Sequence, residues 1–442
     1  MRRIIMTITQ LLGWLGFVFT IALVTSVLFR PPVAPRGDTA AVRAVLEQRL
    51  DQAVAGDDLV GGALLLLEDG AVASEHYAGL ADVGRPVTQE TVFQLASVSK
   101  AAAAWVVMTL VDDGLVELDA PVSRYVEDYT IPSNDFSPDA VTTRRLLSHT
   151  AGLTDGLGYL GFVPPVPTQS LEQSLLNAAD TAPGRDGIVQ IGEEPGAGWR
   201  YSGGGYTILQ LLVEEVTGEP FAHYAQTAVL DPLGIEDAAF GWDEAYAGMI
   251  AQNYTEDGEL ADLRRFTALA AAEMYATAPE LAQFTLAAAP GPSGEPVGRG
   301  ILSPELAAAM TSPHPEATVG RTSVWGLGYQ IHAEMGPDHY VAGHIGNNRP
   351  GLNHAIVIDP VTGDGIVALG TGGTAAVTLT CDWMVWYSGT IPRSCEDLYL
   401  SQAVLPVIVA SIAGLSAIVL WQGVIGPRVE AAAQKRRAGS KR

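Results

Sequence analysis

Ser97 and Lys100 are the two residues whose types and spacing most directly suggest covalent chemistry in this chain. They are three positions apart, so on a helix their side chains share one face of a single turn. A serine hydroxyl becomes a good nucleophile when a base takes its proton, and a lysine amine can be that base once burial lowers its pKa. The residues after Lys100 are mostly alanine, which offers an amine little hydration. The pair therefore predicts nucleophilic catalysis.

The same spacing more often arises from a serine that caps a helix and a lysine exposed to solvent. The composition of the chain favours the catalytic interpretation. Only three lysines are present, and Lys435 and Lys441 both lie in the C-terminal tail. Between residues 31 and 397 every other positive charge belongs to one of fifteen arginines. Because arginine cannot act as a base at neutral pH, Lys100 is the only basic side chain of this region that can easily lose its proton.

A helix is expected to begin at Ser97 and to hold the pair in place. Gly114 supplies its stop signal. Its apolar face comprises Val98, Ala101, Ala102, Trp105, Val106 and Leu110.

Strand patterns lie on both sides of a helical middle. Leu59–Leu67 and Ala71–His76 are typical of a hairpin. Four further strands are expected over Trp325–His332, Tyr340–Ile345, Gly351–Ile358 and Gly365–Leu369. The sequence thus predicts an α+β fold in which the first hairpin joins the last strands in one antiparallel sheet flanked by helices.

Two uncharged apolar segments, residues 4–29 and 398–427, each exceed the roughly 20 residues that span a bilayer. The alternatives are a cleaved signal peptide for the first and a buried core helix for the second. Basic residues precede the first segment and follow the second, so the positive-inside rule places both termini in the cytoplasm.

The expected organisation therefore has four parts. They are an N-terminal transmembrane anchor (4–29), an extracytoplasmic domain (38–397), a C-terminal transmembrane helix (398–427) and a basic cytoplasmic tail (428–442). The expected location is the cell membrane.

Residues 31–397 contain 48 acidic and 16 basic side chains, and this imbalance argues against nucleic-acid binding. Cys381 and Cys395 are the only cysteines, and we expect a disulfide between them outside the cell. Their spacing fits no zinc motif, so neither a metal nor a cofactor is expected.

Several short motifs occur in a fixed order along the chain. They are Ser97-x-x-Lys100, Leu146–Leu153 (LLSHTAGL), Trp199–Tyr206 (WRYSGGGY), Glu215–Gly218, Pro232–Gly234 and Gly343–Gly346. In this order and spacing they resemble the β-lactamase-related serine hydrolases, specifically the class C β-lactamase and D-Ala-D-Ala carboxypeptidase branch. The resemblance covers most of residues 38–371.

The resemblance implies a role for each matching position. Ser97 matches the acylated nucleophile and Lys100 its base. Tyr201 matches the tyrosine of the Y-x-N element, whose phenol shares in proton transfer. His344–Gly346 falls where the family has K-T-G or H-x-G, on the strand that lines the site. The backbone N–H groups of Ser97 and Asn347 match the oxyanion hole.

Tyr201 and His344 also have ordinary interpretations as buried core residues, and His149 is assigned to packing. Two positions depart from the class C pattern. Gly203 stands where those enzymes carry asparagine, and His344 replaces the lysine that helps to bind a β-lactam carboxylate. These departures favour a peptidase or esterase over an efficient β-lactamase.

The sequence therefore predicts a membrane-anchored serine hydrolase that acts on amide or ester bonds of a small molecule or peptide through an acyl-enzyme on Ser97. The alternative is a non-catalytic ligand-binding or sensor protein that keeps the same fold. Protein partners are not predicted.

Overall fold

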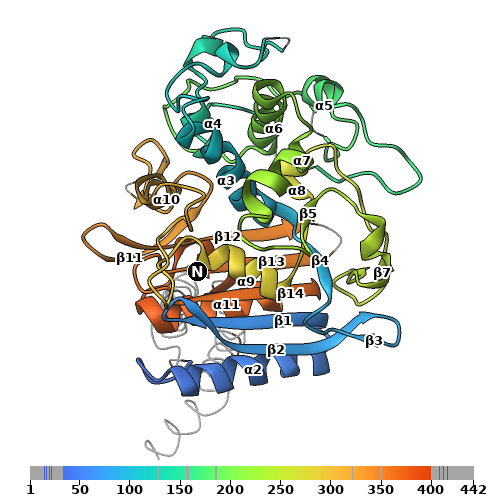
Figure 1. Cartoon of the computed structure of the whole chain (residues 1–442). Coiled ribbons are helices and arrows are strands. Elements are labelled where there is room, and N and C mark those ends of the chain that lie inside the picture. The colour runs from blue at the N-terminus through green and yellow to red at the C-terminus, as the bar shows by residue number, and fades with distance from the viewer. Residues whose placement is uncertain are drawn as a thin grey trace, which may run out of the picture. The chain divides into compact units, whose positions relative to one another are not determined.

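The computed structural model describes most of the central chain. The described range is 33–399 without 128, 156–158, 185–186, 321 and 349–350, plus isolated positions near both ends. Residues Val33–Pro392 form one structural unit. Figure 1 shows this unit as a sheet carrying helices, with a larger helical region above it.

A seven-stranded antiparallel sheet is built from both ends of this unit, in the order β11-β12-β13-β14-β1-β2-β3. The strands are β1 (Leu59–Glu68), β2 (Ala71–Asp82), β3 (Arg85–Pro86), β11 (Gln330–Gly336), β12 (His339–Asn348), β13 (Leu352–Ile358) and β14 (Gly365–Gly372). The pairing of β1 with β14 sets Leu65 opposite Val367. The predicted α+β fold, with the first hairpin beside the last strands, is confirmed.

Several predicted element boundaries are wrong. The strand expected to end at His76 continues to Asp82, and the α-helix expected to begin at Ser97 begins at Ser99, after a 3-10 turn over Ala96–Val98. The strand expected over Trp325–His332 begins only at Gln330. Gly328 has a φ of +90°, and the N–H of Gly326 donates a hydrogen bond to the carbonyl of Tyr329. This tight turn interrupts the apolar pattern that suggested a strand, and it leaves Trp325 outside β11.

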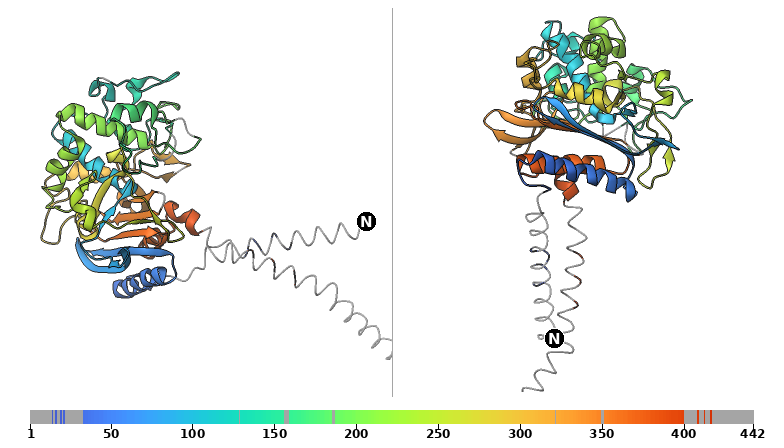
Figure 2. Two further views of the ribbon diagram at one scale, coloured as in Figure 1. Left: turned by 90° about the vertical axis from the view of Figure 1, so that its right-hand side faces the viewer. Right: turned by 60° about the horizontal axis from the view of Figure 1, so that its bottom comes forward.

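Helices cover both faces of the sheet. On one face lie α2 (Thr39–Ala55) and α11 (Ala375–Ser388), side by side in Figure 2. The Asp38 carboxylate caps α2 by accepting the N–H of Ala41 at 2.9 Å, as expected of an N-cap aspartate. The opposite face carries α9 (Ala278–Leu286) and the helical region.

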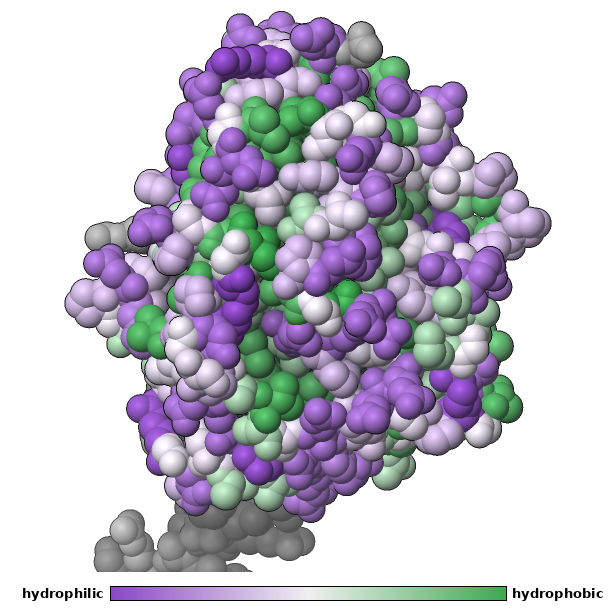
Figure 3. All heavy atoms as spheres, viewed as in Figure 1, coloured by the Kyte–Doolittle hydropathy of each residue, from purple (hydrophilic) through white to green (hydrophobic). Residues whose placement is uncertain are grey.

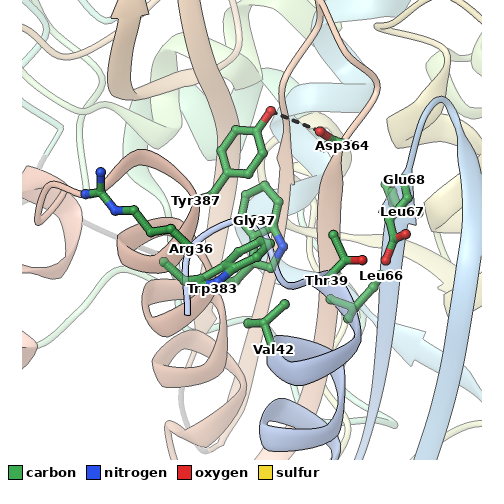
Figure 4. A pocket seen from close by; sticks show the side chains of 11 residues that line it. Arg36, Gly37, Thr39, Val42, Leu66, Leu67, Glu68, Asp364, Trp383 and Tyr387 are labelled. Carbon is green, nitrogen blue, oxygen red and sulfur yellow. Dashed lines mark hydrogen bonds between the residues drawn. The ribbon is translucent and has the colours of Figure 1, made fainter. Parts of the chain in front are cut away.

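A cavity of about 240 Å³ lies between α2 and α11 (Figure 4). Trp383 and Tyr387 stack in it at 4.7 Å, and the Tyr387 hydroxyl donates to Asp364 at 3.1 Å. None of the predicted site residues lines this cavity, so it is distinct from the Ser97 region.

The helical region surrounds α3 (Ser99–Asp112), whose residues from Ser99 to Leu110 are all buried. A helix that is apolar on every side must be enclosed on every side, which explains its central place. It packs against α6 (Gly203–Thr217), α7 (Phe221–Ala225) and α8 (Leu269–Ala272). The other helices of this region are α4 (Thr143–Leu147), α5 (Leu171–Asn177) and α10 (Pro304–Met310). The outer surface of the view in Figure 3 is mostly hydrophilic, and hydrophobic side chains show mainly in its hollows.

Short elements connect these layers. A small sheet in the order β4-β8-β5 joins Val92–Gln94, Met274–Thr277 and Ala239–Phe240. Two hairpins pair β6 (Asn253–Tyr254) with β7 (Leu260–Ala261), and β9 (Thr318–Val319) with β10 (Thr322–Ser323). The remaining turns are η1 (Ala96–Val98), η2 (Val122–Arg124), η3 (Pro138–Ala140), η4 (Gln226–Leu230, a π-turn that continues α7) and η5 (Glu244–Gly248).

The two predicted membrane segments, 4–29 and 398–427, lie almost entirely outside the described residues. Among the residues that are described, no helix is both long and apolar enough to cross a bilayer. Cys381 and Cys395 are both disulfide-bonded, as expected.

Candidate active site

Ser97 sits in a tightly tied turn between β4 and α3. The preceding residue, Ala96, has a φ of +48°, a left-handed conformation that few non-glycine residues adopt. The Ser99 hydroxyl donates to the carbonyl of Ala96 at 2.6 Å and accepts the N–H of Met274 at 2.9 Å. The N–H of Leu95 also donates to the carbonyl of Met274, at 2.8 Å. Strand β8 therefore holds the turn that presents the partly exposed Ser97.

Lys100 lies directly beneath Ser97 and is almost fully buried, with 2% of its surface exposed. Its Nζ donates to the carbonyl of Ala271 at 2.6 Å and lies 3.3 Å from Ser97 Oγ. The rings of Tyr201 and Tyr206 flank the amine, with centroids at 5.0 and 5.6 Å. Burial lowers the pKa of Lys100 to about 7, although the charge of Asp155 opposes the shift. At neutral pH a large fraction of this lysine is therefore an uncharged base.

Tyr201 completes a three-residue cluster with Ser97 and Lys100. Burial raises the pKa of its phenol, and a hydrogen bond with Ser97 partly offsets that rise. The phenol thus stays protonated at neutral pH and can pass a proton on without becoming a base itself. Its position is fixed by His149, whose ring lies 4.4 Å away and whose Nδ1 accepts the N–H of Ser202 at 3.2 Å.

His344 on β12 is fully buried. Its Nδ1 faces the carbonyl of Ile345 at 2.9 Å, and since a carbonyl only accepts, Nδ1 must carry the proton. Burial, together with the charge of Lys100, lowers the pKa of His344 to about 3. The imidazole is therefore neutral, with a lone pair on Nε2, and cannot supply the cation that a lysine would place here.

Gly346 brings β12 against the Ser97 turn. A Cβ at this position would lie 2.6 Å from the carbonyl oxygen of Leu95, so only glycine fits. The N–H of Ile345 points away from β13, because it donates to Gln330 Oε1 at 3.0 Å. The backbone N–H groups of successive residues in a strand point to opposite sides. The N–H of Asn347, two residues further on, therefore points to the same side as that of Ile345. The side-chain amide of Asn347 donates a hydrogen bond to Asn353 Oδ1 at 2.7 Å.

The structure thus brings the predicted residues Ser97, Lys100 and Tyr201 into mutual contact and sets Gly346 against their turn. His344 packs against Trp325, and Trp325 packs against His149. The ring centroid of Trp325 lies 5.3 Å from that of His344 and 4.7 Å from that of His149.

The sequence patterns missed three residues beside the site, Asp155, Tyr159 and Trp325. Asp155 and Tyr159 lie next to Gly203: a Cβ built there would be 3.0 Å from Tyr159 Cε2 and 3.9 Å from Asp155 Oδ2. The signal that could have found Asp155 is its place, four residues after the Ala151 of the LLSHTAGL motif. Among the residues the structure describes, no group of three or more side chains could hold a metal ion.

The Beta-lactamase family matches residues 46–382, which is well over half of the chain. The chain belongs to the beta-lactamase family. The resemblance inferred from the sequence is thereby confirmed.

Relatives in the beta-lactamase family carry several names. Esterase EstB of Burkholderia gladioli is 34% identical over 221 residues, which cover 47% of this chain and 54% of that protein. Penicillin-binding protein 4 of Amycolatopsis lactamdurans is 28% identical over 218 residues, 48% of this chain and 53% of the relative. The chain thus matches only about half the length of these curated relatives.

Solved structures of the beta-lactamase fold superpose over more of the chain. The crystal structure of SurE is 26% identical with a TM-score of 0.60, covering 84% of this chain and 78% of SurE. D-amino acid amidase from Ochrobactrum anthropi SV3 is 22% identical with a TM-score of 0.59, covering 84% of this chain and 99% of the amidase. At that identity the second likeness supports the fold alone.

Proposed function

We propose that this beta-lactamase-family protein is a serine hydrolase that cleaves amide or ester bonds through an acyl-enzyme on Ser97. The observation that carries the proposal is the contact of 3.3 Å between Ser97 Oγ and the buried Nζ of Lys100. A lysine with a pKa of about 7 is close to the ideal for a general base at neutral pH.

The reaction follows from these positions. Ser97 Oγ bonds to the substrate carbonyl carbon while its proton passes to Lys100 Nζ. The backbone N–H groups of Ser97 and Asn347 donate hydrogen bonds to the carbonyl oxygen and stabilise the negative charge that develops on it. The carbonyl C–N or C–O bond then breaks, and the leaving group takes the proton back through Lys100 and Tyr201. Attack by water releases the acid and restores Ser97.

A peptidase or esterase activity fits this site better than efficient β-lactam hydrolysis. Gly203 offers no side-chain amide to a substrate, and the neutral His344 offers no cation to a β-lactam carboxylate. The name of the esterase relative is in keeping with this preference. The contact among Ser97, Lys100 and Tyr201 also favours an enzyme over the alternative, a non-catalytic ligand-binding or sensor protein.

We further propose that segments 4–29 and 398–427 anchor the protein in the cell membrane, with the hydrolase domain outside and both termini in the cytoplasm. The support is their uncharged apolar composition and their basic flanks. Protease added to intact cells should spare tags at both termini. Digestion of the C-terminal tag from outside would contradict this topology.

The hydrolase proposal is tested by labelling with a fluorophosphonate probe and by turnover of a p-nitrophenyl ester. Ser97→Ala should abolish both, and peptide mass spectrometry should locate the adduct on Ser97. Ser174→Ala is a control for the loss of one serine hydroxyl away from the site, because Ser174 lies in α5. Equal labelling of wild type and Ser97→Ala would refute the proposal.

A further inference from the structure

The missing side chain at Gly203 does not leave an empty space. Gly203 lies two residues after Tyr201, so a side chain at this position would form part of the wall of the site. A Cβ there would lie 3.0 Å from Tyr159 Cε2 and 3.9 Å from Asp155 Oδ2. The volume that an asparagine side chain would enter is therefore bounded by an aromatic ring and a carboxylate.

Asp155 is a buried carboxylate whose two oxygens are used unequally. Only 9% of the residue is exposed. Oδ2 accepts the N–H of Gly204 at 2.7 Å, in the first turn of α6. Oδ1 has no hydrogen-bond partner among the described residues. A buried carboxylate oxygen without a partner is costly, so such a group calls for an explanation.

The simplest explanation is structural, because a carboxylate at a helix N-terminus is stabilised by the free N–H groups there. That role accounts for Oδ2 but leaves Oδ1 unexplained. Burial raises the pKa of Asp155, while hydrogen bonds from Ser202, Gly204 and its own backbone N–H, together with the charge of Lys100, limit the rise. The carboxylate lies close enough to Lys100 for its charge to act on that amine.

The charges around the site point to the kind of substrate group that Oδ1 would bind. Of the arginines near the site, Arg145 forms an ion pair with Glu316 and Arg200 forms one with Glu193. Arg264 donates to the backbone carbonyls of Leu160 and Gly161. His344 is neutral, as its lowered pKa requires. The described site therefore holds one buried lysine, which is needed for proton transfer, and one carboxylate with a free oxygen. This balance suits a cationic substrate group and disfavours a carboxylate.

We propose that Asp155 is a substrate-binding residue whose free Oδ1 accepts a protonated amine on the acyl part of the substrate, near the scissile carbonyl. Asp155 thereby takes the place of the side chain absent at Gly203. The inference rests on the proposed hydrolase function and names its substrate class: acyl groups that carry a free ammonium group, in preference to N-acylated or carboxylate-bearing ones.

The test compares alanine p-nitroanilide with N-acetylalanine p-nitroanilide, each as the D- and L-form. The wild type should favour the free amine in kcat/KM by about tenfold to a hundredfold, the usual range for a hydrogen bond to a charged group. Asp155→Asn should bring this ratio close to one. A purely structural role would lower kcat/KM for both substrates equally and leave the ratio unchanged, which would overturn the proposal.

Asp180→Asn is a matched control. Asp180 is also a buried carboxylate, with Oδ2 accepting the N–H of Gly161 at 3.1 Å and Oδ1 unpaired among the described residues. It does not act on the charge of Lys100, so this variant should keep the wild-type ratio. An equal change of the ratio in both variants would contradict the assignment to Asp155.

A second measurement uses the wild type alone and so does not depend on how the variant folds. The preference for the free amine should decline as the pH rises above about 8, where an α-amine loses its proton. A preference that persists in the neutral amine would overturn the proposal. Ser97-dependent ester turnover without any amine preference would leave the hydrolase function intact and remove only this inference. Loss of Ser97 dependence would refute the hydrolase function itself.

Discussion

The site has two walls of different chemistry. The helical wall carries Ser97, Lys100, Tyr201 and Asp155, and its ionisable groups act on one another's pKa values. The strand wall is β12, which contributes a neutral histidine, a glycine and backbone N–H groups. The difference suggests that the two walls have separate roles. Protons move along the helical wall, while the strand wall shapes the site and binds the substrate oxygen.

Trp325 links the two walls, since its buried ring contacts His149 on one side and His344 on the other. His149 in turn packs on Tyr201. Aromatic packing thus holds the two walls together, and no ion pair among the described residues connects them.

Lys100→Arg should have the largest effect of any substitution that keeps the charge. A guanidinium stays protonated and cannot accept the Ser97 proton, so turnover should fall by about a hundredfold to ten-thousandfold. Ester turnover and thermal unfolding should be measured on the same preparation. Full turnover in a folded variant would exclude the serine–lysine mechanism and would favour a binding protein that only needs a positive charge.

Tyr201→Phe should lower turnover by about tenfold to a hundredfold, since one hydroxyl that contacts Ser97 is lost. Tyr206→Phe is the matched control: its ring also flanks Lys100, but its hydroxyl donates to the carbonyl of Leu147 at 3.2 Å. Steady-state kinetics of the two variants should separate them clearly. Equal losses would show that the phenol of Tyr201 has no special part in proton transfer.

Gly346→Ala tests the strand wall. The added methyl group would meet the carbonyl of Leu95, so the Ser97 turn or β12 must shift, at a cost of about 1–3 kcal/mol in the free energy of unfolding. Gly336→Ala, in β11, is the control because a Cβ there meets nothing within 4 Å. Only Gly346→Ala should lower both the free energy of unfolding, measured with denaturant, and the turnover. Equal behaviour of the two variants would mean that β12 does not press on the turn.

The fold was largely predictable because its signals are local. The hairpin turn after β1, the Asp38 cap and the apolar helix after Ser97 are each visible within a few residues. The start of β11 was not predictable in this way, because the apolar alternation from Trp325 continues through a glycine turn. The hydrophobic pattern alone does not distinguish such a turn from a strand.

Some residues of the site could likewise be predicted from local sequence, and others could not. Ser97 and Lys100 are linked by helical spacing, so their contact could be expected. Asp155 and Tyr159 reach Gly203 only through tertiary packing of a loop more than 40 residues away in sequence. His149 was assigned to packing, and the structure places it in contact with the Tyr201 ring.

The central claim is that a neutral Lys100 activates Ser97, and the pH dependence of Ser97 labelling tests it most directly. Since the neutral amine is the active form, the rate of labelling by a fluorophosphonate should rise with pH through a midpoint near the Lys100 pKa of about 7 and then level off. Asp155→Asn should move the midpoint to lower pH, because the Asp155 charge raises the pKa of Lys100. A rate that does not change between about pH 5 and pH 9, or an adduct on a residue other than Ser97, would contradict the account.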